Sequence, residues 1–171
     1  CIRDSETAEI AIESALTGHL VFSTLHTNDA AGAVTRLQDM GVEGYLISSS
    51  LLAIQAQRLV RRVCTDCAST GPISADELAV LQITREECPE INRGHGCESC
   101  GHTGYRGRVG LYELLLINDA IRHHVASGAD ANVICNEATS AGMRTLREDA
   151  LDKLKVGLTT PEEVVRVTRA L

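Results

Sequence analysis

Four cysteines in two Cys-x-x-Cys pairs are the residues whose type and spacing indicate chemistry most directly. The pairs, separated by 29 residues, are Cys64 with Cys67 and Cys97 with Cys100. Two such turns brought together form a closed, all-sulfur tetrahedral site, and thiolate ligands in that geometry favour zinc over magnesium or calcium. The pattern predicts a zinc site that closes a long excursion from a larger domain. Two disulfides or unpaired thiols are the alternatives.

The other three cysteines, Cys1, Cys88 and Cys135, show no pairing pattern, and we expect them to be free thiols. Cys88, together with His95 and His102, lies close enough in sequence to the pairs to replace one of the four ligands. Four cysteine ligands leave no coordination position for water. A zinc ion held in this way would therefore be structural, and metal-assisted hydrolysis is not expected.

The composition of the chain argues against several classes of protein. A formal net charge of −7 over 171 residues disfavours a general nucleic-acid binder. One Phe, three Tyr and no Trp leave few aromatic rings for base stacking. No apolar run approaches the ~20 residues of a bilayer-spanning helix, so we expect no transmembrane segment. Seven cysteines without a recognisable secretory signal indicate the reducing cytoplasm.

The elements expected in the first 62 residues follow the order helix, strand, helix, helix. They are a helix capped by Asp4 or Ser5 and ended by Thr17-Gly18, a buried strand over 20–25, a helix from Thr27 or Asn28 to Met40, and a helix over 45–57. This order predicts one edge of an α/β layer whose remaining strands are not in the sequence. Because the chain also opens on Cys1 instead of Met, we expect a fragment.

Residues 63–110 are rich in Gly, Pro, Ser, Cys and charged residues, with one helical stretch over 75–81. Glycines between 104 and 110 have the spacing of a phosphate loop, but no Gly-Lys-Ser/Thr follows, which favours a turn leading into a return strand over 111–116. From residue 118 onward the sequence is helical. The expected helices cover 119–127, 131–141, 144–156 and a last one that opens on the capping box Thr160–Glu163, with Pro161 at its first position.

His19 and His26 flank the expected strand. If the strand ends near Leu25, His26 lies at its carboxyl end, where α/β sheets bind ligands, beside a helix N-terminus suited to anions. Taken alone, a histidine in such a place is more often a structural hydrogen-bonding group than a catalyst.

Several segments of the chain resemble the secretion ATPases. Residues 1–8 and Thr-Gly-His-Leu-Val-Phe-Ser-Thr-Leu-His-Thr-Asn at 17–28 resemble the stretch after the Walker B motif and the His box of these enzymes. Residues 56–61, the tetracysteine loop, residues 104–108 and the helical tail are similar as well. Nearly the whole chain thus resembles the C-terminal ATPase domain of the type II secretion ATPases (general secretory pathway protein E), and the type IV pilus assembly ATPases are closely similar. Residues 48–52 favour the secretion branch.

The resemblance implies an α/β fold, the C-terminal part of a RecA-like P-loop ATPase domain, with a zinc-binding tetracysteine subdomain and a C-terminal helical bundle. The implied domains are residues 1–62, the distal part of the RecA-like core; 63–110, the zinc subdomain; and 111–171, the return strand and helical subdomain. The full-length protein would be a homo-hexamer that binds ATP and Mg²⁺ between subunits. It would drive pseudopilus assembly and type II protein secretion from the cytoplasmic side of the inner membrane, with secretion platform proteins as partners.

The resemblance also implies roles for single residues. His26, with His19, belongs to the His box near the γ-phosphate; Arg3 follows the Walker B segment; and Arg58 lies close to bound nucleotide. Phosphoryl transfer depends mostly on positioning and charge neutralisation, which arginine and histidine supply. Arg36 is a further candidate for this charged edge, although a solvated helix arginine or a subunit contact explains it better.

Two parts of the family pattern are not in these residues. The Walker A loop and the acidic segment that supplies the general base would lie upstream. Cys1 stands where the family pattern Gly-Glu-Ile-Arg-Asp has its Walker B glutamate, and a thiol cannot orient the water shell of magnesium. We therefore expect this polypeptide alone to be inactive.

Two other functions remain open. One is a non-catalytic zinc-binding interaction module that docks a membrane-platform partner. The other is a zinc-dependent nucleic-acid binder that uses the local cluster of Arg58, Arg61 and Arg62. The acidic balance of the whole chain counts against the second.

Overall fold

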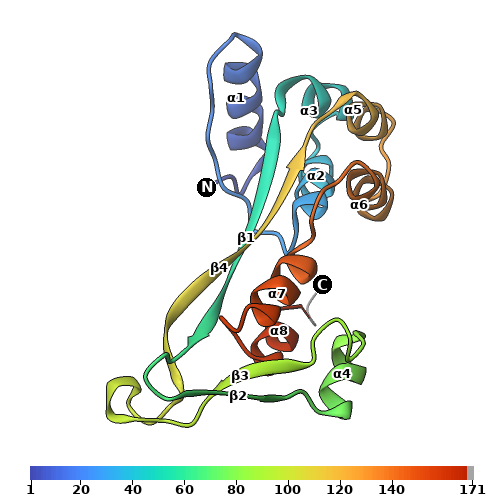
Figure 1. Cartoon of the computed structure of the whole chain (residues 1–171). Helices are drawn as coiled ribbons and strands as arrows, with labels where there is room; N and C mark the ends of the chain where they lie inside the picture. Colours follow the sequence, from blue (N-terminus) through green and yellow to red (C-terminus); the bar gives the residue numbers. More distant parts are fainter. Residues whose placement is uncertain (169–171) are drawn as a thin grey trace. The chain divides into compact units, whose positions relative to one another are not determined.

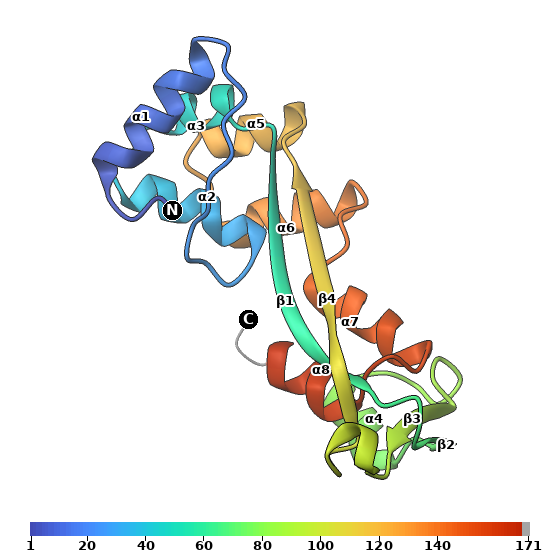
Figure 2. The same cartoon turned by 90° about the vertical axis from the view of Figure 1, so that its left-hand side faces the viewer.

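The computed structural model describes residues 1–168 (Figure 1, Figure 2). Its elements in chain order are α1 (Ser5–Leu16), α2 (Ala30–Asp39), α3 (Gly44–Ser50), β1 (Ala53–Val63), β2 (Ala68–Pro72), α4 (Ala75–Leu81), β3 (Glu90–Gly94), a 3₁₀ turn (Glu98–Cys100), β4 (Tyr105–Leu116), α5 (Asp119–Ala126), α6 (Ala131–Ser140), α7 (Leu146–Lys155) and α8 (Pro161–Thr168). β1 pairs with β4, and β2 pairs with β3.

The chain divides into two compact units, each made of two segments. The first unit consists of Cys1–Ala56 with Glu113–Thr145, and the second of Gln57–Tyr112 with the chain from Leu146 onward. Helices α5 and α6 therefore pack with α2 and α3 in the first unit, whereas α7 and α8 pack together in the second. The three-part division predicted from the sequence, at residues 62 and 110, remains a prediction about functional domains.

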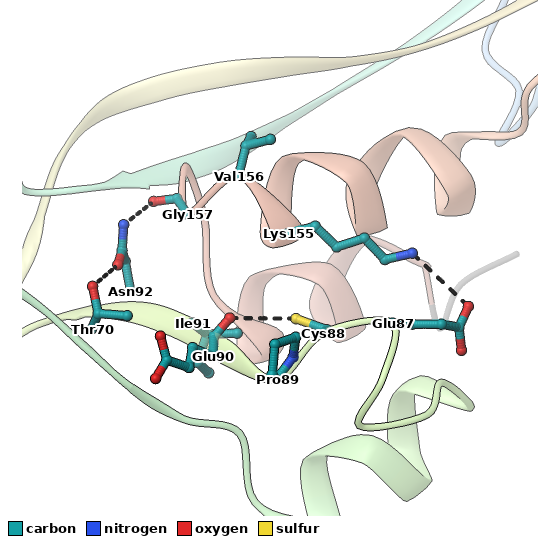
Figure 3. Close-up of a pocket in the computed structure, with 10 residues that line it drawn as sticks. All are labelled: Thr70, Glu87, Cys88, Pro89, Glu90, Ile91, Asn92, Lys155, Val156 and Gly157. Atoms are coloured by element: carbon teal, nitrogen blue, oxygen red, sulfur yellow. Dashed lines mark hydrogen bonds and ion pairs between the residues drawn. The ribbon is translucent and has the colours of Figure 1, made fainter.

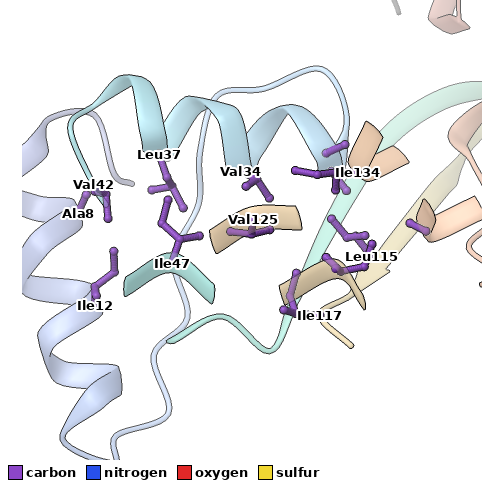
Figure 4. Packing of buried hydrophobic residues seen from close by; sticks show 14 of the residues in the cluster. Ala8, Ile12, Val34, Leu37, Val42, Ile47, Leu115, Ile117, Val125 and Ile134 are labelled. Atoms are coloured by element: carbon purple, nitrogen blue, oxygen red, sulfur yellow. The ribbon is translucent and has the colours of Figure 1, made fainter. Parts of the chain in front are cut away.

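The first unit has an aliphatic core between its helices and the inner side of the paired strands (Figure 4). Its most buried side chains are those of Ala8, Val34, Ile47, Leu115, Ile121, Val125 and Ile134. The helix predicted after Asp4 is confirmed: Asp4 caps α1 by accepting a hydrogen bond from Thr7 N at 2.8 Å. The cap of α2 is Asp29, which accepts from Gly32 N at 2.6 Å, and not Thr27 or Asn28 as predicted.

The strand predicted over residues 20–25 is wrong, because these residues have no regular secondary structure. Leu20 is 71% exposed and Phe22 88% exposed, so the apolar run is not buried. Apolar residues form a buried strand only where a neighbouring strand supplies a ladder of hydrogen bonds. Here the segment is held by a bond from Ile2 N to Thr24 O at 2.8 Å.

The helix predicted over residues 45–57 is correct only in its first half. α3 ends at Ser50, Leu51 has extended backbone angles, and β1 begins at Ala53. Apolar residues at 51, 52 and 54 fit a helix as well as a strand, and pairing with β4 decides between them. Ile117 N donates to Leu52 O at 3.0 Å at this end of the pair.

The second unit contains the excursion between the two cysteine pairs. β2 and β3 form an antiparallel pair whose register runs from Ala68 opposite Gly94 to Pro72 opposite Glu90, and neither strand was predicted. The helix predicted over 75–81 is confirmed as α4, which Ser74 and Glu77 open with a reciprocal capping box.

The turn predicted between residues 104 and 110 is wrong, because β4 begins at Tyr105. Gly107 and Gly110 are therefore strand residues, and the turn before the strand is made by Gly101 and Gly104, both with positive φ. Glycine spacing alone predicted a loop, whereas pairing with β1 extends the strand through it.

The helices predicted after residue 118 are confirmed as α5 to α8, and Pro161 is the first residue of α8. The predicted capping box differs in detail, since the buried Glu163 carboxylate accepts hydrogen bonds from Arg61 and Arg166. Among residues 1–168, none of the helices combines the length and the apolar character that crossing a bilayer requires.

Candidate functional site

The two Cys-x-x-Cys pairs meet in the second unit. The four sulfur atoms, from Cys64, Cys67, Cys97 and Cys100, all lie within 4.8 Å of one another. Cys64 is buried and the other three are half-buried. The gathering predicted from the spacing is therefore confirmed.

The distances between the sulfur atoms fit a metal site better than disulfides. Cys64 Sγ lies 3.9 Å from Cys97 Sγ, and Cys67 Sγ lies 3.9 Å from Cys100 Sγ. A disulfide would require about 2.05 Å. In a regular tetrahedral zinc–thiolate site, bonds of about 2.3 Å separate the sulfurs by about 3.8 Å. The four thiols thus have the chemistry and the spacing that a zinc ion requires.

Backbone N–H groups point at two of the sulfurs, as thiolate ligands require. Cys97 N and Gly104 N donate to Cys100 Sγ at 3.2 and 3.3 Å, and Gly96 N donates to Cys67 Sγ at 3.3 Å. The bond from Cys97 N is the main cause that lowers the pKa of Cys100 to about 6. Desolvation raises the pKa of Cys67 to about 11. The cluster is therefore electrostatically uneven, with its best-supported thiolate at Cys100.

Two glycines bring the strands together beside the cluster. A Cβ on Gly94 would overlap the backbone of Gly104, and a Cβ on Gly104 would overlap Gly94. Gly104 O also accepts a hydrogen bond from Cys64 N at 2.9 Å, which fixes the first pair beside the second. A side chain at either glycine would push the two Cys-x-x-Cys turns apart.

The alternative ligands predicted near the pairs lie outside the cluster of four sulfurs. Cys88 is buried and its thiol donates to Glu90 O. The ring of His95 binds the Ser69 hydroxyl, and His102, in a left-handed conformation, donates its backbone N–H to Cys97 O. Cys1 and Cys135 lie in the first unit and are not part of the cluster.

Polar residues for which the sequence analysis predicted other roles or none connect the cysteine cluster to the start of α8. Tyr105, directly after Gly104, has its hydroxyl 2.9 Å from Thr160 Oγ1, and the Arg61 guanidinium lies over the Tyr105 ring at 4.0 Å from its centre. The Glu163 carboxylate accepts from Arg61 N at 2.7 Å and from Arg61 Nε at 3.0 Å. The sequence did contain a signal for this buried ion pair, because Glu163 lies among the apolar positions of the last helix.

A hollow of about 320 Å³ lies in the same unit, between β3 and the end of α7 (Figure 3). Asn92 bridges it, accepting from Thr70 Oγ1 and donating to Gly157 O. Lys155 faces Glu87 across it at 3.9 Å. Its polar groups bind one another, so the hollow adds no chemistry to the cysteine cluster.

His19 is an exposed residue that closes the end of α1. Its Nδ1 lies 3.2 Å from Ser14 O and 3.2 Å from Thr17 Oγ1, and its backbone N–H donates to Ser14 O. These contacts agree with the structural alternative for this histidine.

His26 and Arg3 lie in two segments of the first unit that the bond from Ile2 N to Thr24 O holds together. Both side chains are exposed, and neither has an ion pair or hydrogen bond within residues 1–168. Both are therefore free to meet a ligand. Their roles toward nucleotide remain predictions.

Arg58 and Arg36 lie in different units. Arg58 is a half-buried residue of β1 in the second unit, and Arg36 is an exposed residue of α2 in the first. A nucleotide role for Arg58 also remains a prediction.

Glu113 is a buried carboxylate that the sequence analysis missed. It lies on β4, 4% exposed, and accepts a hydrogen bond from Ala30 N, the first residue of α2, at 2.8 Å. The helix follows His26 by four residues, so Glu113 fixes the position at which the His-containing segment ends. Its signal was a charged residue between Leu111 and Leu115 at an inward position of an alternating strand.

Comparison with known proteins matches the chain over almost its whole length. The profile of the family described as "Type II/IV secretion system protein" matches residues 1–166. Type II secretion system protein E of Aeromonas hydrophila is 48% identical over 168 residues, which cover 98% of this chain and 33% of the relative. Type IV pilus assembly ATPase PilB of Thermus thermophilus is 51% identical over 169 residues, covering 98% of this chain and 19% of the relative. The chain spans about a third or less of these relatives.

Solved structures show the same fold. The pilus retraction motor PilT, crystallised with ADP, superposes with a TM-score of 0.64 at 26% identity, over 99% of this chain and 39% of PilT. The ATPase DotB of Yersinia pseudotuberculosis gives 0.66 at 20% identity, over 99% of this chain and 36% of DotB, and this likeness shows the fold alone. The α/β fold of this chain therefore matches part of these ATPases.

Proposed function

The chain belongs to the type II/IV secretion system protein family, and from that premise we propose that it is the C-terminal part of a hexameric secretion ATPase. In the full-length protein, ATP hydrolysis would drive pseudopilus assembly and type II protein secretion. The observation that carries this proposal is the 48% identity to type II secretion proteins along 98% of the chain. The motor would work on the cytoplasmic side of the inner membrane, together with secretion platform proteins.

A type IV pilus assembly ATPase is the alternative, because PilB of Thermus thermophilus is as similar, at 51% identity. Relatives from both branches match 98% of this chain, so these residues do not separate the two branches. The two readings differ in the filament that the motor builds, which depends on partners outside these residues.

The tetracysteine cluster would hold a structural zinc ion. The four sulfurs would supply all its ligands, and Gly96, Cys97 and Gly104 would donate N–H groups to two of them. Bound zinc would join the two ends of the 29-residue excursion and leave no open position for water. Its contribution would be to the stability of the second unit. A non-catalytic interaction module built on this site is compatible with the motor.

The residues proposed to contact nucleotide lie in the first unit, apart from Arg58. His26 and Arg3, exposed and without partners in residues 1–168, are available to stabilise phosphate charge. The 171 residues contain no Gly-x-x-x-x-Gly-Lys-Ser/Thr motif. We therefore expect these residues alone to show no magnesium-dependent ATP turnover, and a measured turnover by the pure polypeptide would contradict this.

A chimeric motor tests the proposal. The matching segment of the Aeromonas hydrophila E protein is replaced by this chain from Ile2 onward, so that the host residue at the position of Cys1 is kept. We expect magnesium-dependent ATP hydrolysis and restored secretion in a strain that lacks its own E protein. A soluble, hexameric chimera without hydrolysis would contradict the motor function.

A parallel chimera in the Thermus PilB protein distinguishes the branches. Restored piliation without restored secretion would assign the chain to pilus assembly.

Within the secretion chimera, His26→Ala should lower turnover by about 100-fold if the histidine stabilises transferred charge. His123→Ala, at an exposed position of α5, is the matched control and should leave turnover unchanged.

A further inference from the structure

We propose that metal binding at the four cysteines fixes the position of α8, and with it the groove between α4 and α8. This inference rests on the proposed zinc site, and it assigns that site a conformational role beyond closing its own loop. All the residues involved lie in the second unit.

The first link joins the sulfurs to the start of β4. Gly104 donates its N–H to Cys100 Sγ at 3.3 Å and accepts from Cys64 N at 2.9 Å. Gly104 is thus hydrogen-bonded to both Cys-x-x-Cys pairs, and it approaches Gly94 so closely that a Cβ on either residue would overlap the backbone of the other. A metal ion that draws the four sulfurs together would therefore also fix the next residue, Tyr105.

The second link joins Tyr105 to the N-terminus of α8. The Tyr105 hydroxyl lies 2.9 Å from Thr160 Oγ1, directly before the first residue of the helix. Thr160 is 3% exposed and its neighbour Thr159 is fully buried, with Thr159 Oγ1 donating to Arg61 O at 2.9 Å. Separating the pair is costly chiefly on the side of Thr160, because its buried hydroxyl would be left without this hydrogen bond, whereas Tyr105 is half-buried.

The third link is an ion pair between Arg61 of β1 and Glu163 in the first turn of α8. Arg61 packs over the Tyr105 ring and donates to the Glu163 carboxylate through both its backbone N and its Nε. Arg166, one turn later, donates to the same carboxylate. Because Glu163 is fully buried, these bonds define one position of α8 relative to β1. β1 ends at Val63, next to Cys64, so this link returns to the metal site.

Both helices that line the groove, α4 and α8, are connected to the cysteine cluster. The groove is a hollow of about 540 Å³ with a mainly apolar lining that includes Val80 and Leu81 from α4 and Pro161 and Val165 from α8. α4 lies in the excursion that the two cysteine pairs close, and Arg93 of β3 binds the Glu77 carboxylate of α4 at 2.7 Å. Loss of the metal would open the excursion that contains α4. It would also weaken the contacts of Tyr105 and Arg61 that hold α8.

Hydrogen–deuterium exchange on this chain tests the proposal. Purified protein with one zinc per chain, checked by elemental analysis, is compared with protein from which a chelator has removed the zinc. We expect the amides of α8 to exchange at least about tenfold faster without zinc, while those of α6, in the first unit, change little. Faster exchange confined to the cysteine turns, with α8 still protected, would overturn the coupling.

Tyr105→Phe tests the second link while the metal is bound. The variant keeps the ring under Arg61 and loses the hydroxyl bond to Thr160, so α8 should exchange about threefold to tenfold faster at unchanged zinc content. Tyr112→Phe, on the same strand with an exposed side chain, is the matched control and should leave α8 unchanged. Equal exchange of α8 in the two zinc-loaded variants would overturn the proposal. Failure to bind zinc would be seen first in the elemental analysis, and would remove the proposed metal site together with this inference.

Discussion

The cysteine cluster and the segment that carries His26 are two candidate sites in one chain, and they differ in how completely this polypeptide builds them. All four sulfurs of the cluster lie within 4.8 Å, with backbone donors aimed at two of them. His26 and Arg3 are exposed, and His26 directly follows the residues whose predicted strand does not form. A metal site made by two local turns needs little beyond its own neighbourhood. The proposed nucleotide role of His26 and Arg3 would need a phosphate-binding loop as well, and the 171 residues contain no Gly-x-x-x-x-Gly-Lys-Ser/Thr motif.

The largest expected effect comes from removing one metal ligand. Cys97→Ser should abolish stoichiometric zinc binding and unfold the second unit while the first keeps its protection against hydrogen exchange. The free energy of structural zinc binding, about 10–16 kcal/mol in zinc-finger peptides, is as large as the stability of a typical domain. Cys88→Ser, at a buried cysteine outside the cluster, is the control and should retain zinc. Full thermal stability of a metal-loaded Cys97→Ser protein would contradict the four-thiolate assignment.

The second-largest effect is expected from the Glu163 carboxylate, which stabilises the second unit. Two arginines and a backbone N–H outweigh burial and lower the pKa of Glu163 to about 2, from about 4.5 in an unfolded chain. A depressed carboxylate pKa stabilises the fold above pH about 4.5, and this stability is lost as the pH falls toward 2.

Glu163→Gln should therefore cost about 2 kcal/mol at neutral pH, measured by urea unfolding, and should remove part of the acid sensitivity of the second unit. Glu162→Gln, at the exposed neighbouring position, should change the free energy of unfolding by less than about 0.5 kcal/mol. Equal stability and equal acid sensitivity of the two variants would show that the buried carboxylate does not hold α8.

A smaller effect is expected in the first unit from Glu113. Glu113→Gln weakens the acceptor that binds Ala30 N and should cost about 1 kcal/mol, seen as faster hydrogen exchange in the first turn of α2. Glu9→Gln, at an exposed position of α1, is the matched control. Unchanged exchange in Glu113→Gln would mean that Asp29 alone fixes the start of α2.

The sequence predicted local features of the cluster better than those of the first unit. Two Cys-x-x-Cys turns determine their own geometry, so the pairing of Cys64 and Cys67 with Cys97 and Cys100 followed from spacing alone. Helix ends marked by Asp4 and Pro161 were equally local, and both were found. The buried contacts of Glu113 and Glu163 were missed because their partners, Ala30 and Arg61, are far away in sequence.

The elements predicted wrongly share one physical cause. Residues 53–57 and 105–110 are strand because β1 and β4 pair with each other, and residues 20–25 are not strand because no neighbouring strand pairs with them. Sequence patterns report which residues tolerate a strand, and pairing between distant segments decides whether one forms.

The smallest expected effect is that of the histidines on stability. His19→Ala and His26→Ala should each change the free energy of unfolding of this chain by no more than about 0.5 kcal/mol, because both side chains are exposed. In the chimeric motor His26→Ala should still lower turnover. A loss of 2 kcal/mol or so in His26→Ala would make this histidine a structural residue.

Zinc-edge X-ray absorption on the purified chain, with the metal content measured on the same sample, shows directly whether the four cysteines bind zinc. We expect one zinc per chain with four sulfur ligands at about 2.3 Å. A chain without zinc, or a zinc ion with nitrogen or oxygen ligands, would contradict the assignment of the four cysteines and the role of the metal in organising the second unit.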